Sequence, residues 1–318
     1  MKEIGGYIEL DTYILPRLHE EAVALNCGRN ALAYLIEAKK IKKICLPFFL
    51  CDSVKKVCQK YGIHQRYYHI TPEFKPIISS LDKDEWLYIV NFYGQVSNEY
   101  ILELTKKYSH IILDQAQSYF TSPVEGIDTI YTCRKFFGVP DGAFLYTDSQ
   151  IKREIPRDES FKRMNFILGR YERTASEFYE ESYENNKFFE NEPIKKMSKL
   201  TENLLHGLDY DRIKQTRTNN FRILKKRLNN INQISVSMIE GAYMYPLLIP
   251  DAALIKKRLL EHKVYIPTLW PNVLEEVNKD WLEWNYAKNI LPIPCDQRYD
   301  FDDMNYIISL IEGGVKHE

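Results

Sequence analysis

The chain of 318 residues lacks the features that mark several large classes of protein. No apolar run approaches the roughly 20 residues that a helix needs to cross a bilayer, so we expect no membrane-spanning segment. The formal net charge is only −1, which gives no general electrostatic reason for binding nucleic acid or an anionic membrane. We therefore expect neither nucleic acid nor a membrane as a partner.

Cysteine and histidine are present, but their spacings do not resemble metal-binding patterns. The 6 cysteines include no C-x-x-C pair, and the 7 histidines show no ligand spacing, so we expect no metal site. No secretory signal peptide is recognisable in the sequence. Thiols that stay reduced in a cytoplasm are then the simplest expectation, and we predict a cytoplasmic location.

The chain does contain a regular alternation of apolar runs and amphipathic segments. Among them, strands are predicted at residues 43–49, 64–70, 86–92, 111–114 and 128–132, and helices at residues 28–40, 52–61 and after Ser97. Strands that alternate with helices indicate an α/β domain with a mostly parallel, doubly wound sheet. A smaller C-terminal α/β domain is expected to follow, with strands at 234–238 and 243–249 and helices at 251–262 and 300–311. The predicted domain ranges are 1–215 and 216–318.

Residues 110–143 carry the chemistry around which we expect the chain to be organised. The apolar run of residues 111–113 leads directly into Asp114, and Gln117 follows three residues later. The next predicted strand ends at Thr132 and delivers Lys135 into a loop bounded by glycine. Parallel α/β sheets place ligands outside the carboxyl ends of their strands, so Asp114 and Lys135 are expected to meet there.

A lysine and an aspartate in one crevice are the pair that a pyridoxal phosphate enzyme requires. The lysine amine forms a Schiff base with the cofactor aldehyde and later moves protons, while the aspartate keeps the pyridine nitrogen protonated. An amide such as Gln117 would bond the ring oxygen, and Thr132 would bond the phosphate. The start of the helix at Gly28 offers free backbone donors for an anion, although Asn26 or Asn30 would also serve simply as a cap.

These segments resemble the DegT/DnrJ/EryC1/StrS aminotransferases. The resemblance rests on Asp114-Gln115-Ala116-Gln117 and on Thr132-x-x-Lys135-x-x-Gly138-x-x-Asp141-Gly142-Ala143. Further pieces occur in the order of the family: Gly28-Arg29-Asn30-Ala31-Leu32, Leu46-Pro47 with Cys51, Asn91-Phe92-Tyr93-Gly94, Tyr265-Ile266-Pro267 and Leu291-Pro292-Ile293-Pro294. The last two resemble the strands of the small domain, and residues 217–228 resemble the long helix that links the domains.

The resemblance implies a fold type I enzyme with pyridoxal 5'-phosphate as cofactor. Lys135 and Asp114 would be catalytic, Tyr93 would line the substrate pocket, and the cofactor would contact Lys135, Asp114, Gln117, Gly28, Arg29, Asn30 and Thr132. The expected reaction moves an amino group, with glutamate as the donor by analogy, to a keto sugar linked to a nucleotide. The product would enter a surface polysaccharide or a secondary metabolite. A homodimer is implied, because active sites of the family lie between subunits.

The sequence departs from the family at several positions. Cys51 stands where many relatives place an aromatic ring on the cofactor, which leaves Phe48 or Phe49 to stack there, or weak stacking. Arg29 and Asn30 stand where small hydroxyl residues are common, and Thr132 replaces a serine. Relatives that dehydrate sugars carry histidine at the lysine position, so Lys135 favours transamination. A non-catalytic binding protein on the same fold and a pyridoxal phosphate lyase or dehydratase remain the alternatives.

Overall fold

The structure is a computed structural model that describes residues 4–250 and 252–315. Within these residues an eight-stranded sheet has the order β1-β8-β7-β6-β5-β2-β3-β4, and a two-stranded sheet pairs β10 with β9. The strands are β1 (Val23–Leu25), β2 (Lys43–Pro47), β3 (His64–Ile70), β4 (Pro76–Ile77), β5 (Glu85–Val90), β6 (Ile111–Asp114), β7 (Asp128–Thr132), β8 (Ala143–Tyr146), β9 (Met244–Leu248) and β10 (Ile290–Pro294).

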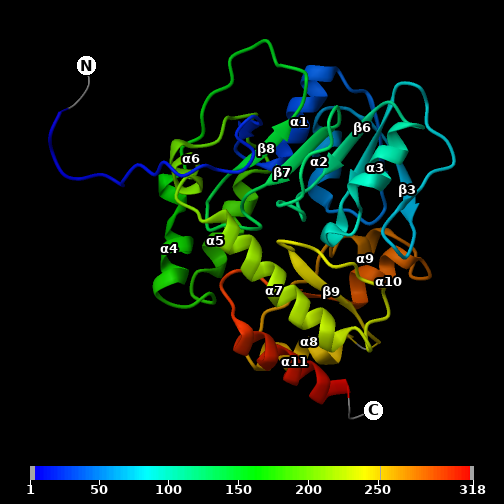
Figure 1. The fold of residues 1–318 in the computed structure, drawn as a ribbon. Coiled ribbons are helices and arrows are strands. Elements are labelled where there is room, and N and C mark those ends of the chain that lie inside the picture. The colour runs from blue at the N-terminus through cyan, green and yellow to red at the C-terminus, as the bar shows by residue number, and fades with distance from the viewer. Residues whose placement is uncertain (1–3, 251, 316–318) are drawn as a thin grey trace.

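Helices surround both sheets, and the long helix α7 runs from the large sheet toward β9 and α11 (Figure 1). The helices are α1 (Gly28–Lys39), α2 (Asp52–Lys60), η1 (Phe92–Gly94), α3 (Asn98–Thr105), η2 (Phe161–Arg163), α4 (Asn165–Glu172), α5 (Tyr179–Phe188), α6 (Lys199–Leu205), α7 (Tyr210–Leu228), α8 (Ala252–Glu261), α9 (Val273–Glu276), α10 (Leu282–Asn289) and α11 (Phe301–Val315).

The centre of the large sheet is parallel. β2 pairs with β3 and with β5, β5 pairs with β6, and β6 pairs with β7, all in parallel. The chain moves outward from β2 to β3 and then returns to β5 on the other side, so the winding direction changes between β2 and β5. The antiparallel strands β8 and β1 extend the sheet beyond β7. This is the predicted α/β class with a mostly parallel, doubly wound sheet.

Local predictions for this sheet agree closely with the structure. β3 and β7 have the predicted bounds, and the helix predicted from residue 28 ends one residue early at Lys39. The Ser97 side chain caps α3 by accepting a hydrogen bond from the backbone N–H of Tyr100. In this half of the chain, apolar runs bounded by polar residues were therefore enough to predict where the strands and helices lie.

The C-terminal part differs from the prediction in two places. Residues 234–238 form no strand, because the Gln95 side chain takes the place of a strand partner: its Oε1 accepts from Ser237 N at 2.7 Å. Residues 265–267 also form no strand, and Pro267 has no N–H to donate to one. The helix predicted at 251–262 is α8, apart from residue 251, which lies outside the described residues. The predicted boundary after residue 215 falls inside α7, and it stays a prediction.

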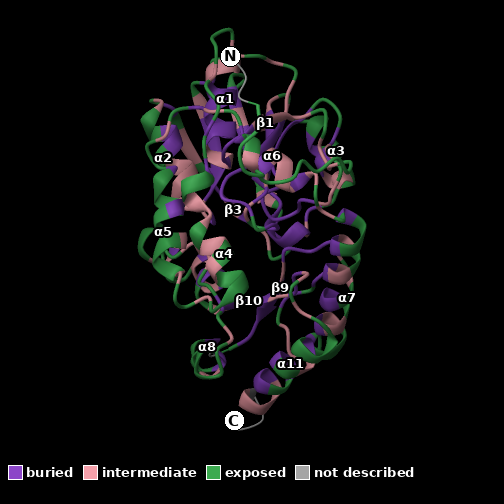
Figure 2. Cartoon of the chain, turned by 90° about the vertical axis from the view of Figure 1, so that its left-hand side faces the viewer, coloured by how far each residue is buried: buried purple, intermediate pink, exposed green. Residues whose placement is uncertain are grey.

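The buried core lies along the strands and the helix faces that cover them (Figure 2). α4 and α5 differ, because α4 has no buried residue and α5 has Asn185 as its buried one. Within the described ranges, no helix has the length and apolar character needed to cross a membrane. The parallel sheet, whose carboxyl edge carries the predicted chemistry, is therefore part of this buried core.

Candidate active site

Four parallel strands bring the predicted chemical groups to one edge of the sheet. β2 leads into the loop that contains Cys51, β5 leads into Tyr93, β6 ends at Asp114, and β7 leads through Thr132 to Lys135. Neighbouring strands are in register, with Val90 opposite Asp114 and Asp114 opposite Ile130. Because all four strands run in the same direction, their carboxyl ends form one site.

Asp114 is held in a fixed orientation by two hydrogen bonds. The Tyr88 hydroxyl donates to Asp114 Oδ2 at 2.8 Å, and the backbone N–H of Ala116 donates to Oδ1 at 2.8 Å. Only 9% of Asp114 is exposed. A carboxylate with two directed donors keeps its position while a third donor, such as a ring N–H, approaches.

Lys135 lies in the loop that follows β7. The residue is exposed to solvent, yet it makes no hydrogen bond or ion pair within the described residues. Burial among dense protein lowers its pKa, the nearby Asp114 carboxylate opposes that effect, and Arg134 adds to it. A lowered pKa supplies the neutral amine that nucleophilic chemistry needs.

Gln117 is fixed by the backbone of the neighbouring strand end. Tyr93 N donates to Gln117 Oε1 at 2.7 Å, which leaves the Gln117 amide nitrogen without a partner in the described chain. Tyr93 reaches this position with a left-handed backbone, φ 54° and ψ 16°. Its ring is 1% exposed and packs against Phe74 and Trp270, so it offers little surface to a substrate in this conformation.

The first turn of α1 approaches the end of β7 closely. A Cβ placed on Gly28 would lie 2.8 Å from Thr132 Cγ2, so a glycine is needed at this contact. The N–H groups of residues 28–30 precede the first intrahelical bond, which runs from Ala31 N to Cys27 O. These backbone donors therefore lie beside Thr132, as the sequence predicted for an anion site.

Two arginines stand at the same helix start without a carboxylate partner in the described residues. Arg29 Nη1 donates to the backbone oxygen of Asn186 at 3.1 Å, and Arg134 Nη1 donates to Asn186 Oδ1 at 2.6 Å. Burial lowers the pKa of Arg134 to about 10, and Arg29 contributes in the same direction. Two cations with neutral partners form a favourable site for a phosphate. Sequence reasoning missed Arg134, because its partner Asn186 lies far along the chain on α5.

The asparagines near the helix start do not cap it. Cys27 is the N-cap residue and makes no side-chain cap bond. Asn30 Nδ2 instead donates to Asn26 Oδ1 and to Pro193 O, both at 2.7 Å, and Asn26 donates to Asp158. The Asn30 side-chain amide is thus already hydrogen-bonded within the protein. Only the backbone N–H of Asn30 is left to bind a ligand.

The aromatic residues considered as replacements for Cys51 have other partners. Phe49 is fully buried, with its ring centroid 5.1 Å from that of Phe92 and 4.4 Å from that of Trp270. Phe48 packs against Tyr67 and against Trp281. The Cys51 thiol lies within hydrogen-bond reach of Ser53 Oγ, at 3.0 Å.

Tyr243 is a further residue of the site that the sequence did not reveal. It directly precedes β9, and Lys135 Nζ lies 5.7 Å from its ring centroid. Burial raises the pKa of Tyr243 to about 12, so the phenol stays protonated at neutral pH. An isolated tyrosine before a strand carries no local signal of this contact, which depends on how the two sheets pack.

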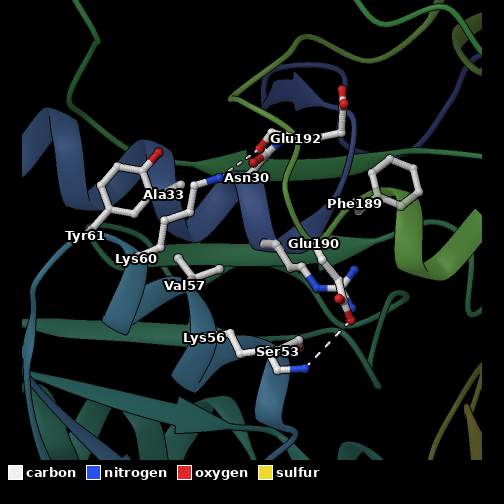
Figure 3. Close-up of a pocket in the computed structure, with 11 residues that line it drawn as sticks. Asn30, Ala33, Ser53, Lys56, Val57, Lys60, Tyr61, Phe189, Glu190 and Glu192 are labelled. Carbon is white, nitrogen blue, oxygen red and sulfur yellow. Dashed lines mark hydrogen bonds and ion pairs between the residues drawn. The ribbon is translucent and has the colours of Figure 1, made fainter.

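A separate surface pocket lies between α1, α2 and residues 189–192 (Figure 3). Arg29 lines it together with Lys56 and Glu190, whose charged groups are 3.7 Å apart. Lys135, Asp114 and Gln117 do not line it. The reactive groups therefore belong to the sheet edge, and Arg29 is the residue shared by the two regions.

The described residues contain no group of three or more histidine, cysteine or acidic side chains that would hold a metal ion. No family model matches the sequence, and neither does any curated protein.

Solved structures, in contrast, match the chain over most of its length. Sugar aminotransferase CalS13 from Micromonospora echinospora matches with a TM-score of 0.62 at 14% identity, covering 92% of this chain and 87% of its own. NtdA from Bacillus subtilis, with bound cofactor PMP, gives 0.67 at 13%, covering 93% and 73%. DesV from S. venezuelae, in complex with a ketimine intermediate, gives 0.64 at 13%, covering 92% and 84%.

The chain has the fold of these aminotransferases. The resemblance seen in the sequence is thereby confirmed at the level of the fold, including the mostly parallel sheet and the smaller C-terminal unit.

Proposed function

We propose that the chain is a pyridoxal phosphate-dependent aminotransferase that acts on a keto sugar. The observation that carries this proposal is the meeting of Asp114 and Lys135 at the ends of the adjacent parallel strands β6 and β7, with the lysine exposed and the Asp114 charge acting on its amine. The fold shared with sugar aminotransferases supports the substrate class.

The residues present fit the cofactor. Lys135 Nζ would bond its aldehyde carbon, the Asp114 carboxylate would pair with its ring nitrogen, and the free amide nitrogen of Gln117 would bond its ring oxygen. Arg29, Arg134, Thr132 Oγ1 and the backbone N–H groups of residues 28–30 would hold its phosphate. When bound, the cofactor carries the amino group between substrates and withdraws electrons from the carbon that loses its proton.

The roles of the side chains follow from their surroundings. Lys135 Nζ takes the proton from the substrate carbon and returns it, because its lowered pKa leaves a neutral amine available. Asp114 stays in place through its hydrogen bonds with Tyr88 and Ala116, and its negative charge would favour a protonated ring nitrogen on a bound cofactor. Tyr243 lies beside the amine, with its ring centroid 5.7 Å from Lys135 Nζ.

The finer assignment follows the family resemblance. Glutamate is the first amino donor to test, and a nucleotide-linked keto sugar is the first acceptor, for a surface polysaccharide or a secondary metabolite. We propose a cytoplasmic homodimer. Exposed aromatic side chains on α4 and α5 support a partner surface, since Tyr171 is 92% and Tyr179 71% exposed.

Borohydride trapping tests the proposal. Purified protein is mixed with pyridoxal phosphate, its visible spectrum is recorded, and the reduced protein is digested and mapped. We expect the cofactor on Lys135, and no modification at the exposed surface residue Lys162 when the cofactor is limiting. No absorption band and no modified peptide would overturn the enzyme assignment.

A non-catalytic cofactor-binding protein on this fold is the second candidate. Cys51 in place of an aromatic ring favours it, since Phe48 and Phe49 are packed elsewhere. Conversion of the bound cofactor to its amine form by glutamate would decide for the aminotransferase. Product analysis with a keto-sugar nucleotide would distinguish it from a lyase or dehydratase.

A further inference from the structure

The carbonyl oxygen of Phe136, the residue after Lys135, is held from the C-terminal part of the chain. Arg217 Nη2 on α7 donates to it at 3.0 Å, and Gln297 Nε2, after β10, donates to it at 2.8 Å. Arg217 Nε also donates to Gln297 Oε1 at 2.7 Å. The three groups form a closed ring of hydrogen bonds.

The Arg217 guanidinium also reaches the segment that carries Tyr243. Its Nη1 donates to Ala242 O at 2.9 Å, and the guanidinium carbon lies 4.7 Å from the centroid of the Phe136 ring. Only 1% of Arg217 is exposed, and it forms no carboxylate ion pair within the described residues. A buried guanidinium that donates to three neutral oxygens cannot move without leaving donors unsatisfied, so it holds those oxygens in place.

The same side chain therefore fixes the backbone on both sides of the reactive amine. Phe136 adjoins Lys135 in the chain, and Tyr243 is the aromatic residue over Lys135 Nζ. The rings of Phe136 and Tyr243 lie 5.7 Å apart and complete the arrangement. A shift of Arg217 would move the lysine loop and its aromatic cover relative to each other.

We propose that Arg217 and Gln297 are positioning residues for Lys135, which hold its amine against Tyr243 and within reach of Asp114. This inference rests on the proposed function, in which Lys135 is the reactive amine. It adds that the lysine is positioned by the C-terminal unit as well as by its own strand. Neither residue touches the reacting atoms, so both act through the Phe136 peptide.

The test measures the reactivity of Lys135 and its dependence on pH. The charged or titratable groups that face the amine are Asp114, Cys51, Arg29, Arg134 and Tyr243, and all of them stay intact in the variants. Wild type, Arg217→Met and Gln297→Leu are each reacted with pyridoxal phosphate and borohydride across a pH range, and labelled Lys135 is quantified by peptide mapping. Arg222→Met is the matched control, because Arg222 is exposed on the same helix and bonds Asn219.

Loss of the hydrogen bonds from Arg217 and Gln297 should let the Lys135 loop move away from the protein packed around it, which would raise the pKa of the amine toward the ordinary lysine value. We expect labelling at pH 7 to fall about tenfold in Arg217→Met, which corresponds to a rise of one pKa unit, and to fall less in Gln297→Leu. The Arg222→Met profile should match wild type, and Arg217→Lys should recover part of the rate.

Two results separate failure of this inference from failure of the function. Wild-type protein that does not label Lys135 at all would overturn the proposed function. If wild-type protein labels Lys135 and the pH profile is unchanged in both Arg217→Met and Gln297→Leu, the positioning role is overturned. This holds even if the two variants melt at a lower temperature. Gln297→Leu keeps the test decisive where Arg217→Met does not fold.

Discussion

The Tyr88 hydroxyl donates a 2.8 Å hydrogen bond to Asp114 Oδ2 across the neighbouring strands β5 and β6. Burial, followed by the charge of Asp114, raises the pKa of Tyr88 well above its usual value, so the phenol remains a donor at every physiological pH. This bond keeps one carboxylate oxygen of Asp114 fixed while the carboxylate interacts with a ligand.

Removing that hydroxyl should weaken both the fold and the reaction. Tyr88→Phe should lower the free energy of unfolding by about 2 kcal/mol, the range for a bond to a charged group. It should also lower kcat by about tenfold, which corresponds to about 1.4 kcal/mol in the barrier. Urea unfolding and steady-state kinetics measure the two effects. The control is Tyr68→Phe, which removes a 2.8 Å bond to the neutral Tyr88 carbonyl and leaves the partners of Asp114 intact. Equal kcat in Tyr88→Phe and wild type would refute the role.

Lys135→Ala should abolish turnover while the fold stays intact. Lys135 is exposed and makes no hydrogen bond within the described chain, so its loss should change the free energy of unfolding by no more than about 0.5 kcal/mol. Calorimetry and an amino-transfer assay test this together. Native-rate transfer by the variant would show that another group performs the chemistry.

The paired arginines should determine affinity for the cofactor phosphate. Arg29→Gln and Arg134→Gln should each weaken pyridoxal phosphate binding about tenfold, since a charge-assisted bond contributes on the order of 1.5–3 kcal/mol. Binding of pyridoxal, which has no phosphate, should change little. Titration with both compounds separates loss of charge from loss of fold. Arg153→Gln is the control, because Arg153 pairs with Glu37 on the surface. A parallel loss for both compounds would argue against a phosphate contact.

Stability should fall in mild acid because of His19. Its imidazole stacks on Tyr131 at 4.0 Å and lies within 3.0 Å of Tyr119 O, and burial lowers its pKa to about 4. The unfolded chain therefore binds a proton between about pH 6.5 and pH 4 while the folded chain does not, so stability is lost as the pH falls through this window. The loss should approach ~3 kcal/mol, since one pKa unit corresponds to about 1.4 kcal/mol.

Urea unfolding at pH 7.5 and at pH 4.5 measures this effect. His19→Gln should remove most of the difference between the two pH values, whereas substitution of the exposed residue His64 by glutamine should preserve it. An undiminished difference in His19→Gln would assign the acid sensitivity to other groups.

The sequence was sufficient where the information is local. The run of residues 111–113 is buried on both faces and ends at Asp114, so both the strand and the position of its carboxylate could be predicted. Parallel pairing of β6 with β7 then places Lys135 beside Asp114 without further information. The fold class followed from the same alternation of strands and helices.

The sequence was insufficient where a contact joins distant segments. Residues 234–238 look like a strand, but the Gln95 side chain satisfies their backbone from 142 positions away. Arg217 and Phe136 are 81 positions apart, and no periodicity links them. Arg134 adjoins Lys135, yet its place in an arginine pair depends on Asn186. Contacts of this kind depend on how whole helices and strands pack together, so they cannot be predicted from a local sequence pattern.

The hydrogen-bonded ring of Phe136, Arg217 and Gln297 joins segments that are synthesised at different times. A ribosome makes the Lys135 loop well before Arg217 and Gln297. A growing chain therefore contains Lys135 before it contains the two residues that hydrogen-bond to the Phe136 carbonyl. On the positioning role proposed above, the lysine reaches its functional geometry only after the segment that follows β10 has joined the fold.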